Sequence, residues 1–226
     1  MAGQNRTALA VVVCGAVLAG FGVIETAREV GPYLNAGVRD EQRFGAVIAG
    51  NYLPAASSMS KDLVVSDCVA VPKTIFARAQ PTARQAEFAT RCRDIARAVV
   101  AEVPTFSAGW LALATASAKL GDLAGVSSGL VASQRTGADV HWLGERRVDL
   151  AVQHMDLLDD TAKAAYRLDL ASLFDSPGGA EVLATRYLGN PAEQAIILDV
   201  GETVPASLQR RFLNKVRELK AGQGAR

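Results

Sequence analysis

The chain has 226 residues, of which 50% are hydrophobic and only 6% aromatic, and its 24 basic side chains nearly balance 23 acidic ones. This composition argues against a disordered chain, and the length suits one modest domain. Alanine carries the apolar content, which favours closely packed helices over a β-sheet core. A net charge of +1, with no basic stripe interleaved with aromatic residues, argues against a nucleic-acid partner.

An uncharged apolar segment lies near the start of the chain, from residue 8 to residue 24, and reads ALAVVVCGAVLAGFGVI. Its seventeen residues reach the short end of the range for a transmembrane helix. Arg6 precedes it and Glu25 follows it, so the positive-inside rule places the N-terminus in the cytoplasm. We therefore predict a single-pass protein of the inner (cytoplasmic) membrane, with its main domain in the periplasm or another extracytoplasmic space.

A cleaved signal peptide is the alternative interpretation of this segment. The residues VLA at 17–19 provide the small side chains that precede a cleavage site. Phe21 and Ile24 continue the apolar run past that site, and we therefore favour a retained anchor. A buried core helix fits less well, because the run is apolar on every side.

Small residues recur in this segment at a spacing that allows two membrane spans to pack closely. The pairs are Gly15 with Ala19 and Ala16 with Gly20. Self-association through the transmembrane helix is one interpretation, and simple richness in alanine and glycine explains the pattern at least as well.

Cys68 and Cys92 lie in the part of the chain that we expect outside the cytoplasm, where thiols tend to pair. Their bridge would close a loop of about 25 residues and stabilise the fold by about 3 kcal/mol. Two free thiols, or buried inert cysteines, are the alternatives. The spacing fits no zinc or Cys-x-x-Cys pattern, and His141 and His154 are distant in sequence, so we predict no metal site.

The middle of the chain has the periodicity of paired helices. Residues 82–103 form a long helix whose inward residues are predicted to be Phe88, Cys92, Ile95, Ala96 and Val99. A second helix carries Trp110, Leu113 and Leu120 on one stripe. Gly121 can then adopt the left-handed conformation that ends a helix, and Asp122 can cap a third helix over 123–133.

This pattern resembles the tetratricopeptide repeat, whose helix pair carries an early aromatic residue and a tight turn. The residues that carry the resemblance are Pro104, Trp110, Leu113, Ala114, Leu120, Gly121, Asp122 and Leu123, and Trp142 follows Trp110 by 32 positions. The repeat is degenerate, because Ser117 stands where a large aromatic residue is expected. The resemblance implies an all-α fold of antiparallel helix pairs in a short solenoid, with Trp110, Leu113, Leu120, Gly121, Asp122 and Trp142 as the repeat-packing residues.

Further helices are predicted over 138–157, and over 159–174 with a cap at Asp159 or Asp160 and with Ala164, Leu168, Ala171 and Phe174 inward. A proline and glycine break at 175–179 precedes short helices over 180–188 and 191–199 and a basic helix over 205–220. The predicted parts are an N-terminal tip and membrane anchor (or signal peptide) at 1–30, an irregular or helical connector at 31–66, tetratricopeptide-like repeats at 67–175, and short helices with a basic tail at 176–226.

Two groups of basic side chains are candidates for contact with a partner or an anionic group. The first follows His141 and the second lies on the last helix, and together they are Arg146, Arg147, Arg210, Arg211 and Lys215. Solvated charges on helices that dock by their apolar stripes explain both groups more simply. The chain has no nucleophile elbow, phosphate-binding loop or dinucleotide fingerprint, so we predict no catalytic residue and no cofactor.

These features predict a membrane-anchored, extracytoplasmic helical scaffold or adaptor that binds protein partners in the cell envelope. Proteins with this organisation commonly accompany envelope machinery such as polysaccharide assembly and export, and the resemblance implies that setting here. The alternatives are a subunit of an envelope enzyme complex, without a site or with a site spread over loops, and an adaptor that faces the cytoplasm.

Overall fold

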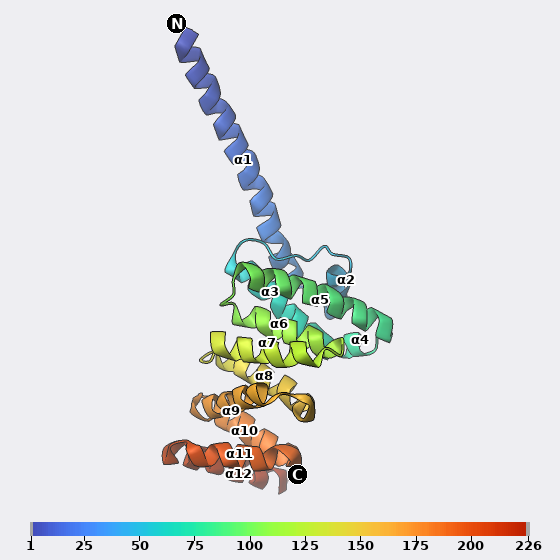
Figure 1. Ribbon diagram of the computed structural model, residues 1–226, viewed down its shortest axis with the longest axis vertical. Coiled ribbons are helices and arrows are strands. Elements are labelled where there is room, and N and C mark those ends of the chain that lie inside the picture. The colour runs from blue at the N-terminus through green and yellow to red at the C-terminus, as the bar shows by residue number, and fades with distance from the viewer. Residues whose placement is uncertain (1, 225–226) are drawn as a thin grey trace. The chain divides into compact units, whose positions relative to one another are not determined.

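The computed structural model describes residues 2–224, and every regular element in that range is helical (Figure 1). The all-α class expected from composition is therefore confirmed. The contacts between residues divide the chain into two units. The first ends at Arg91 and the second begins at Cys92, within one long helix.

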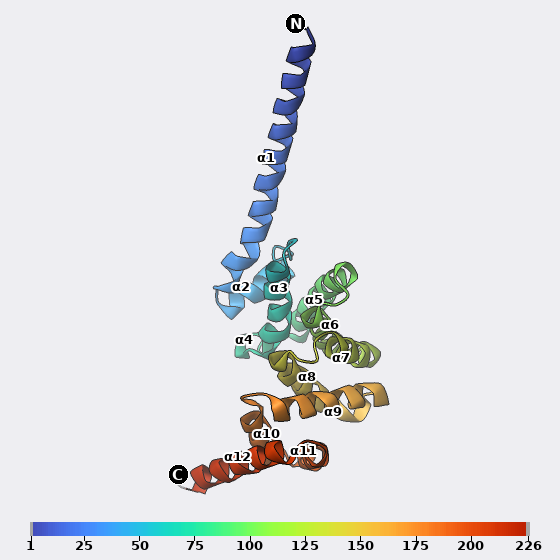
Figure 2. The ribbon, with the colours of Figure 1, turned by 90° about the vertical axis from the view of Figure 1, so that its left-hand side faces the viewer.

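The first unit begins with a long helix and continues with short ones (Figure 2). Its elements are α1 (Ala2–Ala36), α2 (Asp40–Ile48), α3 (Ser58–Ala70), the 3-10 turn η1 (Val71–Lys73), α4 (Ile75–Arg78) and the first half of α5 (Thr82–Glu102). The predicted connector at 31–66 therefore contains the end of α1, all of α2 and most of α3, with a loop between α2 and α3.

Helix α1 carries the apolar segment predicted from the sequence. The stretch Val11–Asn35 is long and apolar enough to cross a membrane, and none of its most apolar part is buried, as in a membrane span or a signal sequence. The helix runs past residue 24 because its far end packs against α3. There, Glu29 accepts hydrogen bonds from the backbone N–H and the hydroxyl of Ser57, both at 2.7 Å.

Aromatic rings form the centre of the first unit. Phe44 of α2 stacks on Phe88 of α5 with 4.7 Å between ring centroids, and Phe76 meets Phe44 edge-on at 5.8 Å. The hydroxyl of the buried Tyr52 donates a hydrogen bond to Asp67 at 2.8 Å. Tyr52 therefore fixes the loop between α2 and α3 to the body of α3.

Cys68 of α3 and Cys92 of α5 are joined in a disulfide, as predicted. Both are buried, and so are the other residues predicted to face inward on α5. The remaining cysteine, Cys14 of α1, is a free thiol.

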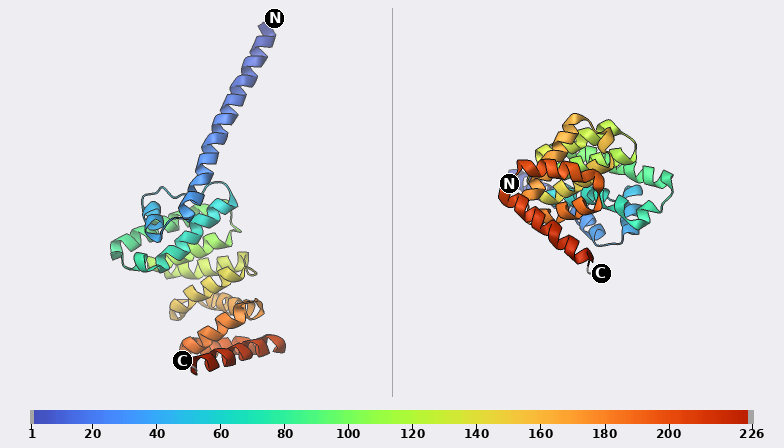
Figure 3. Two further views of the ribbon diagram at one scale, coloured as in Figure 1. Left: turned by 180° about the vertical axis from the view of Figure 1, so that it is seen from behind. Right: turned by 90° about the horizontal axis from the view of Figure 1, so that it is seen from below.

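The second unit is a succession of helices joined by short turns (Figure 3). After the second half of α5 it contains α6 (Ser107–Lys119), α7 (Leu123–Thr136), α8 (His141–Gln153), the 3-10 turn η2 (Met155–Leu157), α9 (Asp160–Asp175), α10 (Gly179–Gly189), α11 (Pro191–Thr203) and α12 (Ala206–Gly224).

Helices α6 and α7 form the hairpin predicted from the sequence. Gly121 has a φ of 75°, and the Asp122 carboxylate accepts a hydrogen bond from the backbone N–H of Gly125 at 2.9 Å, which caps α7. A Cβ on Gly129 would lie 2.9 Å from the Cβ of Ala114. The two helices therefore approach as closely as their glycine and alanine allow, while the arrangement of helix pairs as a solenoid stays a prediction.

The repeat-packing role of Trp142 is wrong, because 48% of this side chain is exposed. The buried face of α8 contains Leu143, Arg147 and Leu150, which are three and four residues apart, and Trp142 lies one position off that stripe.

The predicted inward face of α9 is right at Phe174, which is buried, and wrong at Ala164 and Leu168. Ala164 and Leu168 are exposed, whereas Ala165 and Asp169 are buried in their place. The capping prediction for this helix is confirmed at Asp159, which accepts a hydrogen bond from the backbone N–H of Ala162 at 2.8 Å.

The disulfide leads to the first prediction. Replacing Cys68 and Cys92 together by alanine should lower the free energy of unfolding by about 3 kcal/mol, because the unfolded chain loses a cross-link around a loop of about 25 residues. Thermal unfolding of the full chain in detergent, followed by circular dichroism, measures the change. Cys14→Ala is the matched control and should unfold like the wild type, and equal stability of the double variant and the control would contradict the prediction.

Candidate functional site

An open groove of about 470 Å³ lies in the second unit, between α6, α7 and the start of α9. Pro104 and Trp110 line it beside α6, and Asp159 and Thr161 line it at the start of α9. One face of α7 supplies the rest of the lining, through Ser128, Val131, Ala132, Arg135 and Thr136. These α7 residues recur at three- and four-residue intervals, so a single helix face lies along the groove.

Trp110 is the largest apolar side chain in the lining. Its indole N–H donates a hydrogen bond to the Pro104 carbonyl at 2.8 Å, which fixes the ring at the start of α6. The ring is only half-buried, as are the predicted packing residues Leu113 and Leu120. Because the polar atom of the indole is already satisfied, the ring offers apolar surface to a bound group.

Two charged residues line the groove, and the side chain of only one of them has hydrogen-bond partners among the residues that the structure describes. Asp159 caps α9, and its backbone N–H donates to the Ser127 hydroxyl at 3.3 Å. Arg135 is exposed and makes no hydrogen bond or ion pair with any other residue in the described part of the chain. Its guanidinium is therefore available to a carboxylate on a bound segment.

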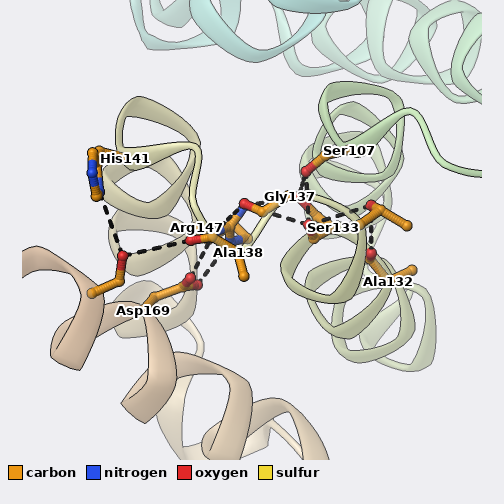
Figure 4. Close-up of polar contacts among 10 residues, drawn as sticks. Ser107, Ala132, Ser133, Gly137, Ala138, His141, Arg147 and Asp169 are labelled. Atoms are coloured by element: carbon orange, nitrogen blue, oxygen red, sulfur yellow. Dashed lines mark hydrogen bonds and ion pairs between the residues drawn. The ribbon is translucent and has the colours of Figure 1, made fainter.

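A buried ion pair lies beside the C-terminal end of α7 (Figure 4). Arg147 of α8 donates from Nε and Nη2 to the two carboxylate oxygens of Asp169 of α9, at 2.8 and 2.6 Å. The two side chains are only 1% and 2% exposed. Arg147 also donates to the carbonyls of Ser133 and Gly137, and Ser107 of α6 donates to the same Ser133 carbonyl at 2.7 Å. The network joins four helices.

Two opposing effects act on the pKa of Asp169 in this pair. Burial raises the pKa of the Asp169 carboxyl above its ordinary value, while the hydrogen bonds and charge of Arg147 favour the ionised form. The planar guanidinium matches both carboxylate oxygens at once, which is the strongest geometry for such a pair.

The buried pair also holds the end of α7. The carbonyls of Ser133 and Gly137 lie at the C-terminal turn of this helix, where carbonyl groups lack partners within the helix. The same turn carries Arg135 and Thr136 into the groove. Arg147 therefore helps to position the groove without lining it.

The prediction that Arg147 contacts a partner or an anionic group is wrong, because its side chain is buried and its donors are used within the protein. The side chain of the neighbouring Arg146 is 50% exposed, and its Nη1 atom lies 3.7 Å from Oδ2 of Asp149. The hydrophobic stripe of α8 faces the protein, and Arg147 falls on that stripe whereas Arg146 does not.

The three basic residues of α12 that were predicted to contact a partner differ in their exposure and in their contacts within the protein. Arg210 is exposed, whereas Arg211 donates hydrogen bonds to the carbonyls of Phe174 and Ser176. Lys215 lies 2.8 Å from Glu218. Arg211 thus serves in docking α12, and contact with a partner remains a prediction for the others.

Sequence reasoning missed Arg135 as a site residue. The sequence did contain a signal for it, because Ser128, Val131 and Arg135 are three and four residues apart and therefore share one face of α7. This face is a different one from the buried face of the helix. The groove itself could not be predicted, because Asp159 and Thr161 are distant from α7 in sequence and only the fold brings them beside it.

Among residues 2–224, no group of three histidine, cysteine or acidic side chains is placed to hold a metal ion. No family model, curated protein or solved structure matches the chain.

The buried pair gives the second prediction. Arg147→Met should destabilise the protein by about 3–5 kcal/mol, because Asp169 would stay buried without its cation. Arg146→Met is the matched control on the adjacent, exposed position, where loss of an exposed pair changes stability by about 0–1 kcal/mol. Thermal unfolding of both full-length variants in detergent checks the difference, and similar melting temperatures for the two would contradict a structural role for the pair.

Proposed function

We propose that this protein is a membrane-anchored, extracytoplasmic binding module whose groove between α6, α7 and α9 receives an exposed segment of a partner protein in the cell envelope. The observation that carries the proposal is the groove itself, whose lining includes both the apolar face of Trp110 and the unpaired guanidinium of Arg135. A partner segment that suits this lining combines an apolar side chain with a carboxylate.

Three features support the anchor and its orientation. Helix α1 exposes an apolar surface long enough to cross a bilayer. The Cys68 to Cys92 bridge is the state that thiols reach in an oxidising compartment, which favours a domain outside the cytoplasm. Arg6 before the span and Glu25 after it favour the same orientation. A signal sequence would also have an apolar helix, and self-association through this segment stays a prediction.

The form of the groove favours binding over catalysis. It is open to solvent, and its lining combines apolar and hydroxyl side chains with Arg135 and one carboxylate that already caps a helix. This arrangement suits a segment of another protein better than a small substrate, which enzymes enclose. The setting in polysaccharide assembly or export, and a role as a subunit of an envelope enzyme, stay predictions.

Site-specific crosslinking tests the proposal. A photoreactive amino acid at Ser128, on the groove face of α7, should form a discrete adduct with a partner protein when cells that carry the full chain are irradiated. The same amino acid at Leu168, which is exposed on α9 and does not line the groove, is the matched control and should form none.

A second variant links the adduct to the groove chemistry. Arg135→Glu should reduce the adduct from position 128, because a carboxylate on the partner would meet a like charge. Equal adducts from positions 128 and 168, or an adduct that Arg135→Glu does not change, would contradict a partner site in this groove.

A further inference from the structure

Large apolar side chains are exposed on the loop between α2 and α3 and at the start of α3, near the end of α1. Leu53 is 59% exposed and Met59, at the start of α3, is 55% exposed. Figures 1 and 2 show that the loop lies at the end of the unit from which α1 extends. Val30 on α1 adds a third exposed apolar side chain there.

The loop is held in place by hydrogen bonds along its length. Tyr52 is buried and bonded to Asp67 directly before Leu53. The backbone N–H of Ala55 donates to the Ser60 hydroxyl at 2.7 Å, and Ser57 donates twice to Glu29 of α1. A loop fixed in this way keeps its apolar side chains in water unless something else covers them.

The hydrogen bonds between Ser57 and Glu29 fix the position of the loop along the axis of α1. Glu29 lies five residues beyond Ile24, where the uncharged run ends, which is about 7.5 Å along the helix axis. The headgroup layer on each side of a bilayer is about 5–7 Å thick, and apolar side chains of surface-bound segments enter about 5–10 Å into this boundary. Leu53 and Met59 therefore lie within reach of lipid if α1 spans the membrane.

We propose that residues 52–59, which comprise the loop and the first residues of α3, rest on the outer leaflet beside α1, with Leu53 and Met59 in the lipid headgroup region. The anchor then holds the first unit against the membrane at two places. This inference rests on α1 being the retained anchor of the proposed function. Ser57 ties the loop to Glu29 of α1, just beyond the apolar run, and for this reason lipid is the partner we assign.

A fluorophore that responds to its surroundings tests the contact. The full chain is labelled with a nitrobenzoxadiazole dye on one cysteine and reconstituted into vesicles of phosphatidylethanolamine and phosphatidylglycerol, with nitroxide groups on either lipid headgroups or acyl chains. The probe position is Leu53→Cys in a Cys14→Ser background, since the other two cysteines are bonded to each other.

Two control positions make the result specific. The native Cys14, labelled in the wild-type chain, reports on α1, and acyl-chain nitroxides should quench it. Ile75→Cys with Cys14→Ser reports on α4, where the side chain is 81% exposed at the other end of the unit, and its emission should resemble that of dye in water. At position 53 we expect a blue shift and strong quenching by headgroup nitroxides.

The outcomes separate the loop from the anchor. Quenching at Cys14, with position 53 as water-exposed as position 75, would overturn the lipid contact and leave the anchor intact. A blue shift at position 53 without quenching by either lipid would indicate contact between copies of the chain, and would also overturn it. Absence of quenching at Cys14 would overturn the anchor and the loop contact together.

Discussion

The buried ion pair of Arg147 and Asp169 joins α8 to α9, and its hydrogen bonds to the end of α7 connect it with α6 as well. Two charges withdrawn from water are tolerated only when their donors and acceptors are matched. The carbonyls of Ser133 and Gly137 and the hydroxyl of Ser133 accept the remaining guanidinium hydrogens. The packing leaves little freedom, because a Cβ on Gly137 would lie 2.5 Å from the hydroxyl oxygen of Ser107. The groove depends on this arrangement, since Arg135 projects from the turn that the pair holds.

Local signals predicted the helices from α5 onward, left α2, α3 and α4 undefined, and failed where a polar side chain is buried. The turn at Gly121 and Asp122 was predictable because left-handed glycine and a capping carboxylate act within a few residues. On α8 and α9, hydrophobicity alone placed Trp142 and Leu168 inward, whereas a buried pair that joins two helices occupies those faces. The groove was missed for a related reason, because its sides come from helices that only the fold brings together.

The first unit and the second contribute different properties to the proposed function. In the first, α1 supplies the apolar surface for a membrane, and the hydrogen bonds of Glu29 to Ser57 continue that helix into the folded unit. In the second, the α6 and α7 hairpin presents Trp110 and Arg135 to solvent. Anchoring confines such a module to a surface, where the effective concentration of a partner in the same membrane is raised.

The most direct test of a membrane-anchored, extracytoplasmic module is intact mass spectrometry of the protein from its native membranes, alkylated with and without reductant. The account predicts a chain that keeps residues 8–24, with Cys14 alkylated at once and with Cys68 and Cys92 alkylated only after reduction. A chain that begins after Ala19 would contradict the anchor. Free Cys68 and Cys92 on a chain with an intact N-terminus would contradict export and favour an adaptor that faces the cytoplasm.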